Sequence, residues 1–201
     1  AAALSGAARL ATYSGDLARA DALAADSVAR WRALGDARGL AFALFNQSIP
    51  YAMRGADGPC GVMLAEARAL FERVGDPWGI AVTISYAGPP MLLRPDRRDV
   101  EAGSLMLTEG RARFQALGDD WGATFCSHYL GTQAMRSGRL DEAWELTAET
   151  LTYSRAVGES YRIARNLHQL AEIDLLRGRT AEALELLAES ISLNIEHGRR
   201  G

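Results

Sequence analysis

The sequence contains no lysine, only two cysteines and no long apolar run. Cys60 and Cys126 are too few for a disulfide framework and fit no metal-ligand spacing, so we expect two small buried side chains. The longest apolar runs, such as residues 40–45, fall far short of the roughly 20 residues that a membrane-spanning helix needs. These absences exclude a disulfide scaffold and argue against a membrane protein.

Clusters of positive charge are also missing. The net charge is −3, and the 22 basic residues, all arginine, form no concentrated patch. Since binding to a nucleic-acid backbone requires clustered basic residues, we expect no direct contact with nucleic acid. The N-terminal residues have neither a basic segment nor a sustained apolar core, so no signal peptide is predicted and a cytoplasmic location is expected.

Motifs for catalysis and for cofactor binding are absent from the sequence as well. It has no glycine-rich phosphate loop, no His-Glu-x-x-His motif and no G-x-S-x-G motif. The histidines His128, His168 and His197 form no close pair that would bind zinc together with cysteine. We therefore predict a protein that is not an enzyme and that uses no cofactor or metal.

A short motif recurs at nearly constant spacing. An apolar residue, a glycine and an acidic residue follow one another at Gly35, Gly75, Gly118 and Gly158, with a degenerate copy at Gly198. The glycines are separated by 40, 43, 40 and 40 residues, which indicates an internal repeat. Glycine in the left-handed conformation ends one helix, and the acidic residue caps the next. Each motif therefore predicts a corner between two helices.

A second glycine divides four of the repeats, 20 residues before the closing glycine. These inner glycines are Gly15, Gly55, Gly138 and Gly178. Each repeat is thus predicted to contain two helices joined by a tight turn. The predicted helices span residues 2–14, 16–34, 37–54, 59–74, 77–88, 99–117, 120–137, 139–157, 160–177 and 179–196.

Small residues recur where paired helices must approach closely. They lie five residues after each inner glycine, at Ala20, Cys60, Ala143 and Ala183, and twelve residues before those, at Ala8, Ser48, Gly131 and Ala171. One helix pair cannot bury its apolar side alone, so successive pairs are expected to stack. The pattern predicts an all-α fold, a right-handed solenoid of about five helix pairs forming a single domain over residues 1–201.

This spacing of small residues resembles the tetratricopeptide repeat. The Leu-Gly-Asp-x-x-Gly pattern that begins at Leu34 and at Leu117 is similar to the long repeats of large bacterial transcriptional regulators of the LuxR, SARP and MalT-like type. Those regulators join an ATPase and a DNA-binding domain to a C-terminal repeat array. The resemblance implies a sensor or interaction segment. Ala1 replaces an initial Met and no polar capping helix follows residues 198–201, so we expect a segment of a longer protein.

The third repeat is three residues longer than the others and contains Gly88-Pro89-Pro90 in its first helix. Proline inside a helix removes a hydrogen-bond donor and clashes with the preceding turn, at about 3 kcal/mol or more. We therefore expect this helix to break near residues 88–91. The break is either a kink that opens a pocket or a tolerated insertion in a loop. Gly103 is the small residue expected near the start of the second helix.

The resemblance places the first helix of every pair on a concave face, with particular positions directed into a groove. The residues at these positions that we expect to bind a ligand are Tyr13, Phe42, Phe45, Met53, Phe125, His128, Met135, Arg136, Arg165 and His168. Such a mixture of aromatic residues and polar anchors is typical of peptide and ligand sites. The alternative is that these side chains pack on the neighbouring pair. Lysine and a matching asparagine are absent from these positions, so recognition of an acidic C-terminus by a carboxylate clamp is not expected.

Two hypotheses for the function follow from this pattern. The first is a binding module whose partner is a protein, a peptide or a small effector in the groove. The alternative is a structural solenoid that scaffolds its parent protein or forms a homodimer through a convex or terminal face, without a groove ligand.

Overall fold

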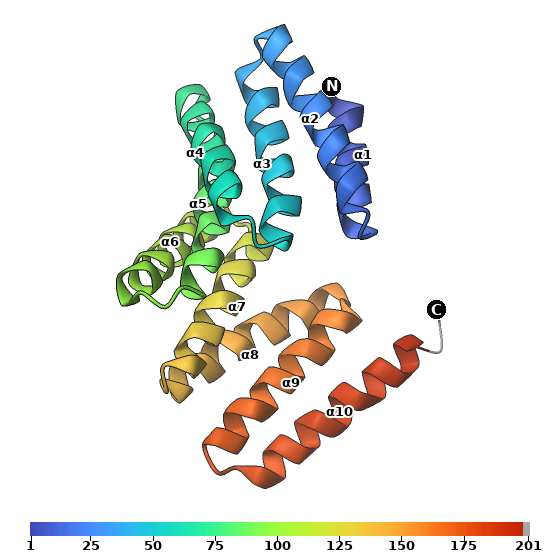
Figure 1. Cartoon of the computed structure of the whole chain (residues 1–201). Coiled ribbons are helices and arrows are strands. Elements are labelled where there is room, and N and C mark those ends of the chain that lie inside the picture. The colour runs from blue at the N-terminus through green and yellow to red at the C-terminus, as the bar shows by residue number, and fades with distance from the viewer. Residues whose placement is uncertain (199–201) are drawn as a thin grey trace. The chain divides into compact units, whose positions relative to one another are not determined.

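The computed structural model describes residues 1–198, and this part of the chain contains ten α-helices and no strand. The helices are α1 (Ala2–Tyr13), α2 (Leu17–Leu34), α3 (Ala37–Met53), α4 (Asp57–Val74), α5 (Pro77–Leu92), α6 (Arg97–Ala116), α7 (Asp120–Arg136), α8 (Leu140–Val157), α9 (Ser160–Leu176) and α10 (Thr180–Gly198) (Figure 1). The all-α prediction is confirmed. None of the helices in residues 1–198 is both long and apolar enough to cross a bilayer.

The helices gather into two compact units, Ala1–Arg113 (unit 1) and Phe114–Gly201 (unit 2). The odd-numbered helices are called A helices and the even-numbered ones B helices. In unit 1, α1 packs on α2 and α3 on α4, while α2 also contacts α3 and α4 contacts α5. In unit 2, α7 packs on α8 and α9 on α10, and α8 contacts α9. The single domain over residues 1–201 remains a prediction.

Eight glycines form the corners between these helices, all with φ between 67° and 80°. They are Gly15, Gly35, Gly55, Gly75, Gly118, Gly138, Gly158 and Gly178. Only glycine adopts this left-handed conformation without strain, so the predicted corners are confirmed. Gly198 is the last residue of α10, and the turn expected over residues 199–201 lies outside the described residues.

Three of the four corners between a B helix and the next A helix also share an aspartate cap and a ring–glycine contact. An aspartate caps the A helix, and a ring from the B helix lies against a glycine four residues beyond the corner. A Cβ on that glycine would come within about 2.5 Å of the ring in each case, which explains the second glycine of the motif. The ring–glycine pairs, called the aromatic junctions below, are Trp31–Gly39, Phe71–Gly79 and Phe114–Gly122.

The helix break expected near residues 88–91 is wrong, because α5 continues through Pro89 and Pro90 and ends at Leu92. Packing against α6 is the reason. A Cβ on Gly88 would lie 2.9 Å from the carbonyl oxygen of Gly103 and 2.8 Å from the Leu107 side chain. This close contact fixes the end of α5, where proline's own φ matches that of a helix. Gly103 is thus the small residue on α6, and Gly88 is its partner.

Candidate binding site on the A helices

The predicted site residues of unit 1 lie on α1 and α3. Tyr13 and Met53 are 76% and 60% exposed near the ends of their helices. Phe42 is partly exposed and stacks on Trp78, with ring centroids 5.9 Å apart. Phe45 is only 6% exposed, and its ring packs edge-on against Tyr86 of α5 at 4.9 Å. In unit 1, therefore, Phe45 joins two A helices, as the packing alternative foresaw.

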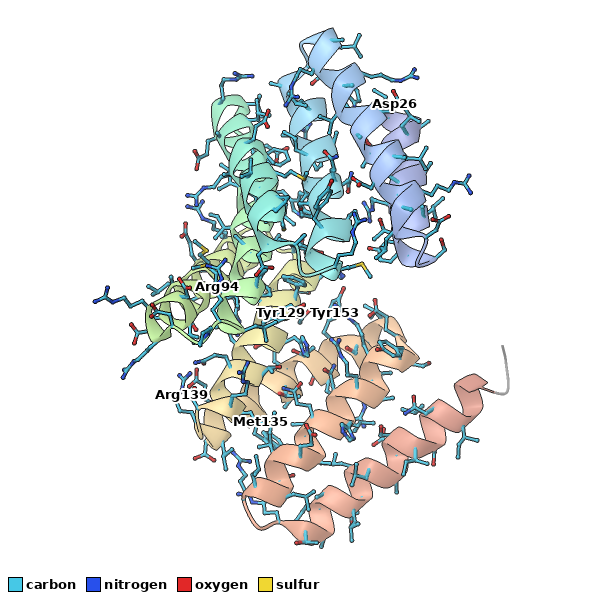
Figure 2. All side chains as sticks on the ribbon, in the orientation of Figure 1. Asp26, Arg94, Tyr129, Met135, Arg139 and Tyr153 are labelled. Carbon is cyan, nitrogen blue, oxygen red and sulfur yellow. The ribbon has the colours of Figure 1, made fainter. Side chains whose placement is uncertain are left out.

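An aromatic row runs along α7 in unit 2. Trp121 stacks on Phe125 at 5.9 Å, and Phe125 meets Tyr129 edge-on at 5.1 Å. The three rings are spaced four residues apart, so they share one side of the helix, and all are partly exposed. The ring of His128 contacts Tyr129 at 5.2 Å. Tyr129 is labelled on α7 in Figure 2. The sequence predicted Phe125 and His128 as site residues but missed Trp121 and Tyr129.

Helix α9 brings positive charge to the same surface. The side-chain amide of Gln169 on α9 donates to the Thr132 hydroxyl on α7 at 3.1 Å, which places the two A helices side by side. Arg162 and Arg165, both on α9, act electrostatically on His128. Arg165 is exposed, and Arg162 is 19% exposed along its side chain.

His128 is neutral at pH 7 in this environment. Burial of the imidazole, and then the positive charges of Arg165 and Arg162, lower the pKa of His128 to about 4. Its Nδ1 atom is buried and has no hydrogen-bond partner among the described residues. Leaving such a group unsatisfied costs about 1–3 kcal/mol, and a ligand atom that reached Nδ1 would recover this cost.

The corner between α8 and α9 differs from the aromatic junctions. Ser154 occupies the position of the ring, and Arg162 occupies the position of the glycine. Glu159 makes no capping hydrogen bond; instead it pairs with Arg162, with Oε2 and Nε 3.2 Å apart. Asn166, which is completely buried, donates to the Ser154 hydroxyl at 3.2 Å. We call Ser154, Arg162 and Asn166 the polar junction.

Two atoms of the polar junction are buried without a hydrogen-bond partner in the described part of the chain. They are Nη1 of Arg162 and Oδ1 of Asn166. Sequence reasoning missed all three residues of this junction. The signal was present, because the fourth corner lacks both the ring and the second glycine that the other three corners possess.

The remaining predicted residues of unit 2 have separate surroundings. Met135, labelled on α7 in Figure 2, packs against the core formed by Ala134, Ala143 and Ile173. Arg136 is exposed at the end of α7. His168 is exposed on α9, with its Nε2 3.5 Å from Oε1 of Glu172. The contacts and charges thus connect Phe125, His128 and Arg165, whereas nothing observed joins Met135 or His168 to them.

The surface of α7 and α9 offers rings, guanidinium donors and an unprotonated imidazole. These groups can bind a ligand through stacking, hydrogen bonds and charge. The side chains that the structure describes, those of residues 1–195, include no group of three or more histidine, cysteine or acidic residues placed to hold a metal ion. The predictions that the chain uses no metal or cofactor and is not an enzyme stay predictions.

Comparison with known proteins identifies the fold. No family model and no curated protein sequence matches the chain. Among solved structures, BtubC (BKLC) from P. vanneervenii superposes with a TM-score of 0.78 at 15% identity, over 97% of this chain and 80% of that one. The putative kinesin light chain TPR-like repeats of Podosopora anserina give 0.67 at 16% identity, over 98% and 96%. MamA gives 0.61 at 15% identity, over 94% and 95%. At such identities the likeness shows the fold alone, and the chain has the tetratricopeptide-like helical repeat fold.

Proposed function

We propose that this chain is a non-catalytic binding module that recognises a protein or peptide partner on α7 and α9. One observation carries the proposal. Buried hydrogen-bonding atoms of His128, Arg162 and Asn166 have no partner among the described side chains, and His128 adjoins the aromatic row of α7. Binding sites combine apolar surface with a few polar anchors in this way.

Thermal unfolding of the full chain in the presence of a peptide library tests this proposal. A ligand present at 100 times its Kd and binding only the folded state adds about 2.7 kcal/mol to stability. Tyr129→Ala should abolish the gain. The control is Tyr161→Ala, which removes an exposed tyrosine from α9. An equal loss in both variants, or no stabilising peptide at all, would contradict the proposal.

The finer proposal is that the module is the sensor or interaction segment of a bacterial transcriptional regulator, located in the cytoplasm. The Leu-Gly-Asp-x-x-Gly corners and the spacing of about 40 residues support it. The reading frame that encodes this chain should also encode an ATPase or a helix-turn-helix domain. A frame that encodes neither of them contradicts this assignment.

A second candidate, a scaffold that forms homodimers, is favoured by an exposed apolar stripe on α10. Leu184, Ile191 and Ile195 are 60%, 57% and 50% exposed, and their spacing places them on one side of the helix. Light scattering of the chain at rising concentration would detect a dimer. Ile191→Arg should return it to a monomer, whereas a monomer at every concentration would eliminate this candidate.

A further inference from the structure

We propose that the partner segment carries an aspartate or glutamate side chain, which binds between Arg162 and Arg165 of α9 beside His128 of α7. The inference rests on the proposed function, since it names the chemistry of the ligand at the same surface. It concerns a side-chain carboxylate within a peptide and not a chain terminus. Three observations support it: unmatched positive charge, an unsatisfied imidazole and an elongated row of rings.

The first observation is that the charges on α9 are not balanced. Arg162 uses Nε for Glu159, while its buried Nη1 has no partner in the described residues. Arg165 has no carboxylate partner among the side chains that the structure describes, those of residues 1–195. Several arginines elsewhere in the chain are matched, as in the pairs of Arg32 with Glu66 and Arg155 with Glu189, each at 2.6 Å. Arg165 and part of the Arg162 guanidinium therefore carry positive charge that a ligand carboxylate would balance.

The geometry of arginine favours a carboxylate as that negative group. A guanidinium presents parallel N–H donors that match the two oxygens of a carboxylate. Arg162 is held in place by its pair with Glu159, so its guanidinium is oriented before a ligand binds. The unsatisfied Nδ1 of His128 offers a further hydrogen bond to the same ligand.

The aromatic row indicates a peptide in preference to a small anion. Trp121, Phe125 and Tyr129 span eight residues of α7, which corresponds to about 12 Å along the helix axis. An extended peptide advances about 3.3 Å per residue, so about four of its residues cover this distance. The rings would contact apolar side chains of the segment, and its acidic residue would lie at the Tyr129 end, where His128 contacts that ring.

A bound carboxylate reverses the electrostatic environment of His128. Burial, and then the charges of Arg165 and Arg162, lower the pKa of the imidazole in the free chain, and a negative charge beside it raises that pKa. Because ligand binding then favours the protonated imidazole, the contribution of His128 to the affinity increases as the pH falls from 7 towards 5, a range in which the ligand carboxylate is still mostly ionised. A purely apolar ligand would produce no such increase.

The test uses a positional library of capped hexapeptides, in which one position is fixed as glutamate, glutamine or arginine. Binding to the full chain is measured at pH 7. We expect peptides with fixed glutamate to bind at least about tenfold more tightly than those with glutamine. Binding without an acidic preference would overturn this inference and leave the proposed function intact, while no binding by any peptide would overturn both.

Substitutions of single arginines test where on the chain the glutamate of the peptide binds. Arg165→Gln should weaken the glutamate peptides about tenfold and leave the glutamine peptides unchanged. Arg162→Gln should act in the same way, but because Arg162 is largely buried, the exposed Arg165 provides the decisive variant. The matched control is Arg179→Gln, which removes the same charge from an exposed position between α9 and α10. Equal weakening by Arg179→Gln and Arg165→Gln would reduce the effect to net charge and overturn the proposal.

The NMR titration of the His128 imidazole separates a peptide from a small anion. The best glutamate peptide should raise the pKa of His128 from about 4 by at least one unit. Inorganic phosphate and succinate at equal concentration should leave it unchanged. If either small anion shifts the titration as strongly as the peptide, the surface binds a free anion and the peptide assignment is wrong.

Discussion

The aromatic junctions and the polar junction occupy equivalent positions in the repeat but are built in different ways. At Phe71–Gly79 a fully buried ring lies directly on a helix that has no side chain at that point. At the polar junction a serine and a buried asparagine take the place of the ring, and an arginine takes the place of the glycine. The aromatic junction leaves no room for a ligand group. The polar junction keeps donors and acceptors that its own residues do not satisfy.

The difference between the two kinds of junction shows how one fold can place stabilising contacts and binding groups at different corners. A buried ring contributes several kcal/mol through apolar burial and dispersion. Buried polar groups without partners oppose folding, so a corner that retains them is less stable than its neighbours. In this chain Arg162 of the polar junction acts electrostatically on His128, whose ring contacts Tyr129 of the aromatic row for which we propose binding.

The largest expected effect is at an aromatic junction. Phe71→Ala removes a fully buried ring and its 4.9 Å edge contact with Phe42, so it should lower the free energy of unfolding by about 3–5 kcal/mol. Ser154→Ala, the matched change at the polar junction, should cost about 1–2 kcal/mol, because the hydroxyl loses its bond to the Thr150 carbonyl and its bond from Asn166. Urea denaturation measures both. Equal losses would remove the distinction between the junctions.

The next effect is a dependence of stability on pH that arises at His128. Its pKa is about 4 in the folded chain and about 6.5 in the unfolded chain, so below pH 6.5 the unfolded state binds the extra proton. Stability from this group is complete above pH 6.5 and should fall by about 3 kcal/mol as the pH reaches 4. Measuring the free energy of unfolding against pH for the chain and for His128→Gln isolates the contribution of His128, because all other groups titrate in both proteins. Parallel stability curves from pH 7 to 4 would contradict the burial of this imidazole.

A smaller effect comes from filling the close contact of an aromatic junction. Gly79→Ala places a Cβ 2.1 Å from the Phe71 ring, so the ring must move, at a cost of about 1–3 kcal/mol. Gly61→Ala in α4 is the control, because nothing lies within 4 Å of a Cβ there. That control should stabilise the chain by up to about 1 kcal/mol through helix propensity. Thermal unfolding should therefore shift in opposite directions for the two variants.

The smallest expected effect is at the caps. Asp36 accepts a hydrogen bond from the backbone N–H of Gly39 at 2.9 Å, so Asp36→Ala should destabilise the chain by about 1 kcal/mol. Glu159 has no such bond, and its pair with Arg162 is partly exposed, so Glu159→Ala should cost less than about 0.5 kcal/mol. Chemical denaturation of the two variants in parallel shows which substitution lowers the free energy of unfolding more. A larger loss for Glu159→Ala would show that its ion pair matters more than a cap.

The helices and corners could be predicted from the sequence because their determinants are local. Gly35 and Asp36 end one helix and begin the next regardless of the rest of the chain, and Gly15 makes the inner turn in the same way. The end of α5 could not be predicted, because its path through Pro89 depends on the contact of Gly88 with Gly103, a feature of tertiary packing.

The candidate site was only partly predictable. His128 and Arg165 could be selected from the sequence because the resemblance to the tetratricopeptide repeat assigns both to groove-facing positions on successive A helices. Phe45 was expected at the same kind of position, yet it is buried against Tyr86, since the size of the facing side chain decides whether a ring is covered. Arg162 was missed because an arginine near a helix start usually faces solvent, and only comparison of the four corners singles it out.

The two prolines of α5 have a consequence for local unfolding. Neither Pro89 nor Pro90 can donate a backbone hydrogen bond to the preceding turn, so the final turn of α5 depends on its contact with α6. Amide protons of Met91 and Leu92 should therefore exchange with solvent whenever α5 separates from Gly103, without the rest of the helix opening. The end of α5 would then be the first part of its hairpin to detach under mild denaturing conditions.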